Sequence, residues 1–246
     1  RQRRLAQPAF HMRRLKVLAT TMADASLELT DRWRSHPVAD PLEAMAAMNA
    51  VTMAIVARTL FGADVSGDIG EVAEAMATLQ EETGRMSITA FFDLPEAMVR
   101  PRGERFEHAV ETLDRVVNRI VAQRRAEPEP RDDLLSMLLE ARDEETGEGM
   151  NDRQLRDELA TLFLAGHETT ALALTWTFHL LAQNPEAESK LHAEVDAVLG
   201  QRLAPSFDDL EKLAYTRMVG EEAMRLYPPA YVFSRTAAGE DRLGPY

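Results

Sequence analysis

The sequence contains no cysteine among its 246 residues. This absence excludes disulfide bonds and every metal or nucleophilic site that needs a thiolate from this chain, and it is compatible with a reducing compartment. Positive charge is also scarce: 28 Lys and Arg stand against 41 Asp and Glu, which gives a net charge of -13. A general nucleic-acid binder needs a broad cationic face, so the balance argues against that class.

The sequence also lacks a clean membrane segment. Residues 159–182 are apolar and long enough to cross a bilayer, but they contain Glu168, two histidines and several threonines. A central acid costs roughly 2.5 to 3.5 kcal/mol on insertion scales, so we expect no transmembrane segment and a soluble, cytoplasmic chain. Residue 1 is Arg rather than Met, and the last residues, LGPY, contain no signal that ends a fold. Both ends are therefore expected to be cut from a longer protein.

Helical patterns cover nearly the whole chain. Apolar residues at three- and four-residue steps predict a helix over about residues 102–125. Asn151, with Gln154 three positions later, predicts a capped helix that runs to Gln183, about 32 residues and roughly 48 Å long. We therefore expect one mostly α domain over residues 1–246.

Toward the end of the chain, proline and glycine mark the predicted helix boundaries. Asn184-Pro185 predicts the start of a new helix that closes at Gly200. A last helix over about residues 215–226 is stopped by Tyr227-Pro228-Pro229, and the alternating AYVFSRTA then predicts an extended strand.

The centre of the long helix carries unusual residues for an apolar run, LFLAGHETTALAL. Gly166 costs about 1 kcal/mol relative to Ala in a helix, so something is expected to approach closely there. Thr169 can donate back to a carbonyl one turn earlier, and Glu168 is a carboxylate in an apolar setting. The predicted face is formed by Leu155, Leu159, Leu162, Gly166, Thr169, Ala173 and Trp176.

Of two other interpretations of this stretch, helix packing stays open and a zinc site is excluded. Gly166 can simply permit close helix packing, with the threonines satisfied by the backbone and Glu168 paired to an Arg. The zinc motif H-E-x-x-H fails at His167-Glu168, because the position of its second His is Ala171. In the last helix, Glu222 and Arg225 are three apart and can pair, which alone is a weak signal.

Two motifs together carry a resemblance. AGHETT at residues 165–170 and EEAMRLYPP at residues 221–229, about 55 residues apart, resemble the oxygen-binding helix and the ExxR helix of the cytochrome P450 family of haem-thiolate monooxygenases. NPEAESKLHAEVD lies between them where the family has its next helix, and RQRRLAQPAFH resembles the end of the W-x-x-x-R helix. The resemblance implies a partial P450 fold, from the end of helix C through helix K and the following strand.

The resemblance also implies roles for individual residues. Ala165 and Gly166 would lie against the haem, and Glu168 and Thr169 would relay protons during dioxygen activation. Glu222 and Arg225 would be structural. Arg3 and Arg235 would pair with haem propionates. The lipophilic substrate would contact Leu162, Ala230, Val232 and Phe233, for which plain core packing is the alternative. The neighbouring Arg4, Arg13 and Arg14 are interpreted as a solvated basic face.

One departure from the family pattern limits these expectations. The family's iron ligand is a cysteine downstream of the PP segment, and this chain has none. We therefore expect an internal fragment of a haem-dependent monooxygenase, inactive by itself, whose parent takes electrons from a ferredoxin or from a separate or fused flavoprotein reductase. The alternative is a non-catalytic helical ligand-binding scaffold of the same fold.

Overall fold

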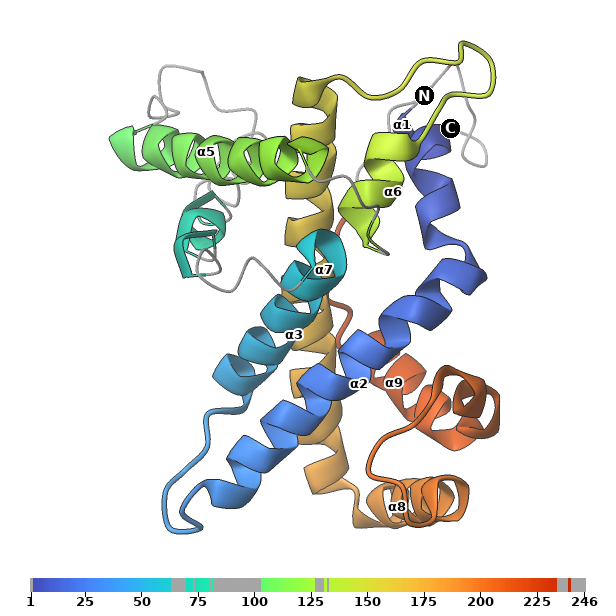
Figure 1. Ribbon diagram of the computed structural model, residues 1–246. Helices are drawn as coiled ribbons and strands as arrows, with labels where there is room; N and C mark the ends of the chain where they lie inside the picture. The colour runs from blue at the N-terminus through green and yellow to red at the C-terminus, as the bar shows by residue number, and fades with distance from the viewer. Residues whose placement is uncertain are drawn as a thin grey trace.

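The computed structural model describes residues 2–62, 70–72, 74–79, 81, 103–126, 131, 133–233 and 239. In Figure 1 the long helix α7 forms a central column, α2 and α3 lie diagonally across it, α5 lies across its upper end and α8 and α9 lie near its lower end. The helices are α1 (Gln2–Ala6), η1 (Gln7–Phe10), α2 (Met12–Ser35), α3 (Ala44–Phe61), α5 (Glu104–Ala126), α6 (Leu134–Glu140), α7 (Asp152–Gln183), α8 (Pro185–Leu199), η4 (Phe207–Lys212) and α9 (Ala214–Leu226). The prediction of a mostly α chain is confirmed.

The boundaries of α7 follow from its predicted capping box. The Asn151 side chain accepts a hydrogen bond from the Gln154 amide at 2.9 Å, and the Gln154 side chain accepts one from the Asn151 amide at 3.1 Å. The helix then runs 32 residues to Gln183. At 1.5 Å per residue it is about 48 Å long, so it reaches from one end of the fold to the other.

The other predicted helices are present with small shifts. α5 begins at Glu104 and α9 at Ala214, within two residues of the predictions. α8 starts at Pro185 and is closed by Gly200, whose φ of +57° lies in the left-handed region that suits glycine.

Two clusters of buried residues form the core, and α3 and α7 contribute to both. The larger cluster packs the second half of α3 with α5, α6 and the first half of α7. The smaller one packs α2 and the first half of α3 around Ala171 of α7. α3 runs antiparallel to α7, because Phe61 lies beside Phe163 while Met45 lies beside Thr175.

The strand predicted after α9 is absent from the described part of the chain. Residues 231–233 have no regular secondary structure. An extended segment becomes a strand only when a neighbour pairs with its backbone, and no described segment supplies that partner. Alternation was therefore not sufficient at residues 231–233, and residues 234–237 of the predicted strand lie outside the described residues.

One described helix, α3, is long and apolar enough to cross a membrane by length and composition, and half of it is buried inside the fold. It packs along α7 and contributes to both core clusters. Core packing accounts for its apolar character, and the run at residues 159–182 considered from the sequence is part of α7.

Candidate functional site

The two sides of α7 have different surroundings. Its buried stripe is Leu155, Leu159, Phe163, His167 and Ala171, which are four residues apart and face the core. About a third of a turn away around the helix lie Leu162, Ala165, Thr169 and Trp176. Ala165 and Thr169 are exposed. We call Ala165, Thr169 and Trp176 the open stripe.

The predicted face is therefore correct at Leu155 and Leu159, and farther along the helix it divides between the two sides. Leu162 is half-buried and packs against the larger core cluster, as the core-packing alternative anticipated. α7 is nearly apolar over its central turns, so its composition does not specify which side packs on α3.

Thr169 makes the predicted backbone contact. Its hydroxyl donates to the Ala165 carbonyl at 2.5 Å, across one turn of the open stripe. Thr161, Thr175 and Thr177 donate to carbonyls four residues earlier in the same way. The bond is thus a common state of threonine in this helix, and the position of Thr169 on the open stripe is what sets it apart.

Gly166 is approached by α3. A methyl group at this position would lie 3.2 Å from Cγ2 of Val56, tighter than an ordinary van der Waals contact. Close helix packing, the alternative kept open above, thus applies at Gly166. The neighbouring residue Ala165 is the small residue that lies on the open stripe.

The carboxylate predicted beside Thr169 lies at the edge of the open stripe. Glu168 is half-buried, so it is less enclosed than the apolar run suggested. Glu168 is the residue next to Thr169 in the sequence.

His167 was given no role by the sequence, and the structure buries it. It is 8% exposed, its ring centroid lies 6.2 Å from that of Phe163, and burial lowers its pKa. Its Nδ1 atom has no hydrogen-bond partner among the described residues. The four-residue spacing from Leu155 through Phe163 could have identified it as a core position.

The predicted pair in α9 is formed. The Arg225 guanidinium donates from Nε and Nη2 to the two carboxylate oxygens of Glu222, both at 2.7 Å. This pairing lowers the pKa of Glu222 and raises that of Arg225. The side chains of Glu222 and Arg225 are 54% and 66% exposed. As an exposed pair it adds little stability to this chain.

A ring contact brings the two motif helices together. Trp176, at the end of the open stripe, stacks on Tyr227 with ring centroids 4.1 Å apart and an interplanar angle of 6°. α9 also packs on α7. The segment that follows α9 therefore begins beside the stripe that carries Thr169.

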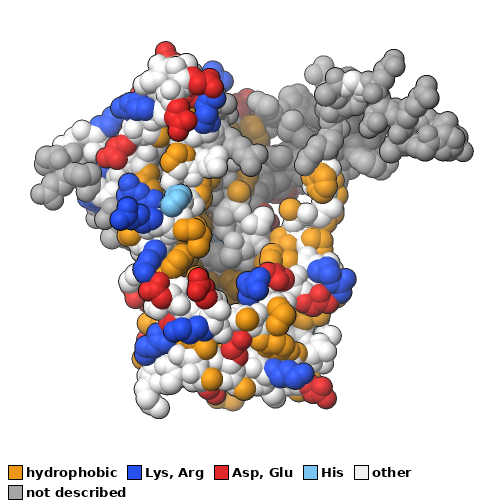
Figure 2. All heavy atoms as spheres, turned by 90° about the vertical axis from the view of Figure 1, so that its right-hand side faces the viewer, with side chains coloured by type: hydrophobic (Ala, Val, Ile, Leu, Met, Phe, Trp, Pro, Cys, Tyr) orange, Lys and Arg blue, Asp and Glu red, His pale blue; other side chains and the backbone are white. Residues whose placement is uncertain are grey.

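Three proposed substrate residues, Ala230, Val232 and Phe233, follow Tyr227 and are exposed, with Val232 at 73% and Phe233 at 76%. Figure 2 shows the face on the right of Figure 1, where hydrophobic side chains lie among charged ones around a central hollow.

Of the basic residues near the two ends of the chain, only some have side chains within the described part of the structure. Arg3 is in α1, and its side chain lies outside the described residues, as does Arg235. Arg4 is partly solvated, with its side chain 41% exposed, and it also binds Asp143 and Glu145, which the sequence did not predict. Asp143 is 139 positions away, which is why local sequence patterns missed it.

A haem fits part of this arrangement. The open stripe presents two small exposed side chains, Ala165 and Thr169, so a flat ring can lie against it without displacing a large side chain. The iron ligand is a different matter, since the chain has no cysteine and no group of three or more potential metal ligands occurs among the described residues. The residues present fit one face of the group and supply no thiolate.

Comparison with known proteins decides the family. The cytochrome P450 family model matches residues 1–243. The chain belongs to the cytochrome P450 family. It is 40% identical over 249 residues to cyclooctatin synthase of Streptomyces melanosporofaciens, covering 99% of this chain and 52% of that protein. It is 35% identical over 244 residues to pentalenene oxygenase of Streptomyces avermitilis, covering 98% of this chain and 52% of the relative.

A third relative of this P450 chain is the bifunctional cytochrome P450/NADPH--P450 reductase 2 of Bacillus subtilis, 28% identical over 244 residues, with 98% of this chain and 23% of that protein covered. The chain spans about half the length of the first two relatives. Family membership and the mostly helical partial P450 fold are thereby established.

Proposed function

We propose that this chain is the dioxygen-facing half of a haem-dependent monooxygenase, in which the open stripe of α7 lies against the haem. The observation that carries the proposal is the placement of Ala165 and Thr169 on one exposed stripe, with Glu168 at its edge and the segment after α9 beside it. Family membership supports the reaction class. The bound haem would supply the activation of dioxygen.

In this proposal, residues of the chain hold a proton and transfer it. Glu168, half-buried, takes a proton from solvent and passes it toward the Thr169 hydroxyl. With haem bound, the hydroxyl would turn from the Ala165 carbonyl toward the haem side of the stripe, where it would donate its proton. Because the carbonyl holds the hydroxyl at 2.5 Å when no better acceptor is present, proton delivery is coupled to the arrival of that acceptor.

Arg3 and Arg235 would hold the haem propionates by charge-assisted hydrogen bonds. Gly166 would let α3 pack closely behind the stripe, as the approach of Val56 indicates. Glu222 and Arg225 would brace α9 and the segment after it, and that pair is already closed in this chain.

The proposed substrate is a small lipophilic organic molecule that contacts Leu162, Ala230, Val232 and Phe233. Two of these side chains, Val232 and Phe233, are large, apolar and exposed. Relatives named for pentalenene and for cyclooctat-9-en-7-ol support this class of substrate. Electrons would come from a ferredoxin or from a flavoprotein reductase, and one relative's name joins a P450 to its reductase. A cytoplasmic location is proposed with it.

The test uses the longer protein that contains this chain. Purified with haem and reduced under carbon monoxide, it should show the red-shifted Soret band of thiolate ligation, and with a redox partner it should insert oxygen into a lipophilic substrate. A longer protein that folds and binds lipophilic ligands but shows no such band would identify the non-catalytic scaffold instead.

A further inference from the structure

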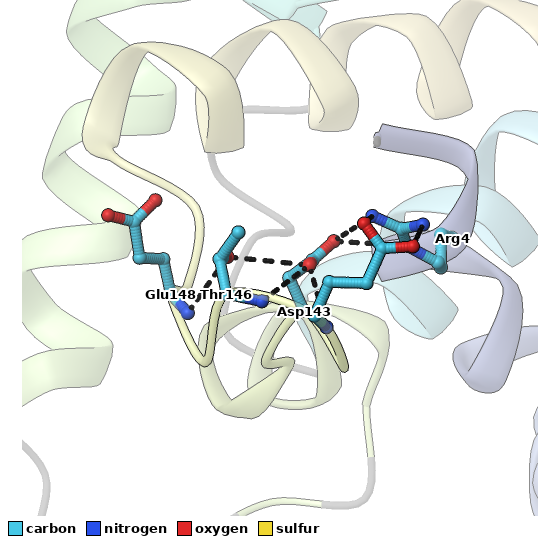
Figure 3. Close-up of polar contacts among 5 residues, drawn as sticks. Arg4, Asp143, Thr146 and Glu148 are labelled. Carbon is cyan, nitrogen blue, oxygen red and sulfur yellow. Dashed lines mark hydrogen bonds and ion pairs between the residues drawn. The ribbon is translucent and has the colours of Figure 1, made fainter.

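Arg4 of α1 lies between two carboxylates of the loop that joins α6 to α7 (Figure 3). Its Nε and Nη2 donate to Oδ2 of Asp143 at 3.1 and 2.9 Å. Its Nη1 and Nη2 donate to the two oxygens of Glu145 at 2.6 and 3.0 Å. We call these three residues the Arg4 clamp. The guanidinium fork suits two simultaneous carboxylate contacts, which a lysine ammonium cannot reproduce.

The loop holds the Asp143 carboxylate in place for this contact. Its second oxygen, Oδ1, accepts from the amides of Glu145 and Thr146 at 3.1 and 3.0 Å and from the Thr146 hydroxyl at 3.3 Å. The backbone closes the turn by a bond from the Gly147 amide to the Asp143 carbonyl at 2.7 Å, and the φ of Gly147 is +70°. The loop's own hydrogen bonds thus orient the carboxylate, which is buried with Arg4 in place.

The Asp143 carboxylate of the clamp is ionised over the whole physiological pH range. The hydrogen bond from Arg4, followed by those from the Thr146 and Glu145 amides, lowers the pKa of Asp143 to about 2. Glu145 is more exposed than Asp143. The buried carboxylate is therefore the main anchor and Glu145 the secondary one.

The clamp bears on α1 because α1 cannot hold itself. It is a helix of five residues, far below the length at which an isolated helix is stable. Beyond the clamp, it is held by the burial of Leu5 and Ala6. The partner loop leads into the capping box of α7, so the clamp fixes α1 relative to the start of α7.

We propose that Arg4 is a positioning residue for haem binding: by fixing α1 through Asp143 and Glu145, it fixes the backbone that carries Arg3. The inference rests on the proposed function, in which Arg3 pairs with a haem propionate. The clamp pairs the Arg4 guanidinium with two carboxylates of its own chain, so in this proposal Arg3, and not Arg4, is the residue that binds the propionate.

The experiment uses the longer haem-loaded protein and four variants. Asp143→Asn and Arg4→Lys weaken the main anchor, and Glu145→Gln weakens only the exposed one. The matched control is Glu28→Gln, because Glu28 binds Arg58 by two bonds of 2.8 Å between α2 and α3, away from α1. Two quantities are measured: hydrogen exchange of the α1 amides, and the rate of haem loss to excess apomyoglobin.

Asp143→Asn and Arg4→Lys should speed exchange in α1 and raise the rate of haem loss about tenfold, as for outer-shell partners of a bound centre. Glu145→Gln should act in the same direction but more weakly, and Glu28→Gln should change neither quantity. Because α1 amides report the clamp directly, a general loss of stability would appear instead as faster exchange throughout the chain.

Faster exchange in α1 with haem loss at the wild-type rate would overturn the positioning role and leave the clamp as a structural contact only. Unchanged exchange in α1 would overturn the clamp itself. The effect should also be routed through Arg3, so Asp143→Asn should add little to the haem loss of Arg3→Ala. Failure of the proposed function would be visible earlier, since the wild-type protein would then bind no haem.

Discussion

Thr169 differs from the other threonines of α7 by its surroundings. Thr177 makes the same kind of bond, to the Ala173 carbonyl at 2.7 Å, but it lies in the groove between α7, α8 and α9. Thr169 makes its bond on the open stripe, where a bound molecule can compete for the hydroxyl. The proposed role therefore depends on access to the hydroxyl, and variants can separate that from helix geometry.

In the longer haem protein, Thr169→Ala should keep haem and substrate binding but lower the yield of product per reductant consumed by about tenfold or more, because positioned proton-transfer groups contribute roughly 10²–10⁴-fold to a rate. The measurement is the ratio of product formed to NAD(P)H oxidised. Thr169→Ser should recover most of the coupling because it keeps the hydroxyl. Thr177→Ala is the matched control and should couple normally; equal uncoupling in both variants would contradict the proton-relay role.

His167 gives a prediction about pH. Burial lowers its pKa in the folded chain below the ordinary value of about 6.5 that applies when the chain is unfolded. Between those two values the unfolded state binds a proton that the folded state does not, so the free energy of unfolding falls as pH drops below about 6.5. The contribution is fully present above about pH 7.5.

The slope should be up to about 1.4 kcal/mol per pH unit for the one proton, and denaturant unfolding of the chain at pH 7.5, 6.5 and 5.5 measures it. His167→Leu should flatten this part of the dependence. His192→Leu, a change at an exposed position, serves as the control and should leave the slope as it is. A slope that survives His167→Leu would place the titrating group elsewhere.

At the scale of elements, the ends of α3, α5 and α6 meet around one buried arginine. Arg124 donates to Asp133 at 2.6 Å, to the Ser136 hydroxyl at 2.7 Å and to the Phe61 carbonyl at 3.0 Å. Gly62 lets this cluster close, since a methyl group there would lie 3.1 Å from Oδ2 of Asp133 and its φ is +80°. Three helices are thus joined by one guanidinium.

Replacing Arg124 by Met should lower the free energy of unfolding by about 3 to 5 kcal/mol, because it leaves the buried Asp133 carboxylate without its counter-ion. Denaturant titration followed by circular dichroism measures the change. Glu221→Gln breaks the exposed pair with Arg217 and should cost less than about 0.5 kcal/mol. Similar losses in both variants would mean that Arg124 is no more important than a surface residue.

Features set by local signals could be predicted from the sequence, whereas features set by tertiary contacts could not. The capping box at Asn151 and the Asn184-Pro185 boundary act within a few residues, so both ends of α7 were predictable. The side of α7 that packs on α3 was not, because its apolar residues surround the helix and the approach of Val56 to Gly166 comes from another helix. Residues 231–233 after α9 likewise form no strand, since pairing needs a distant partner, and the rest of that predicted strand lies outside the described residues.

At the scale of the whole molecule, the candidate site is divided between what this chain contains and what it lacks. The chain supplies the open stripe, the Glu222–Arg225 pair and the Arg4 clamp. The motifs AGHETT and EEAMRLYPP pointed to the open stripe and to the Glu222–Arg225 pair. The clamp joins residues 139 positions apart and had no local signature, so Arg4 could only be found in three dimensions.

Because the chain contains no cysteine, we predict that the isolated chain cannot ligate haem iron through a thiolate. A thiolate is the ligand that donates strongly to haem iron in this family, and only cysteine provides it, whereas the 6 histidines and 12 methionines offer an imidazole or a thioether. The purified 246-residue chain mixed with haem, reduced and exposed to carbon monoxide should therefore lack the red-shifted Soret band of thiolate ligation. The positive control is the longer protein under the same conditions. Appearance of that band in the isolated chain would contradict the assignment of the missing ligand to a sequence outside it.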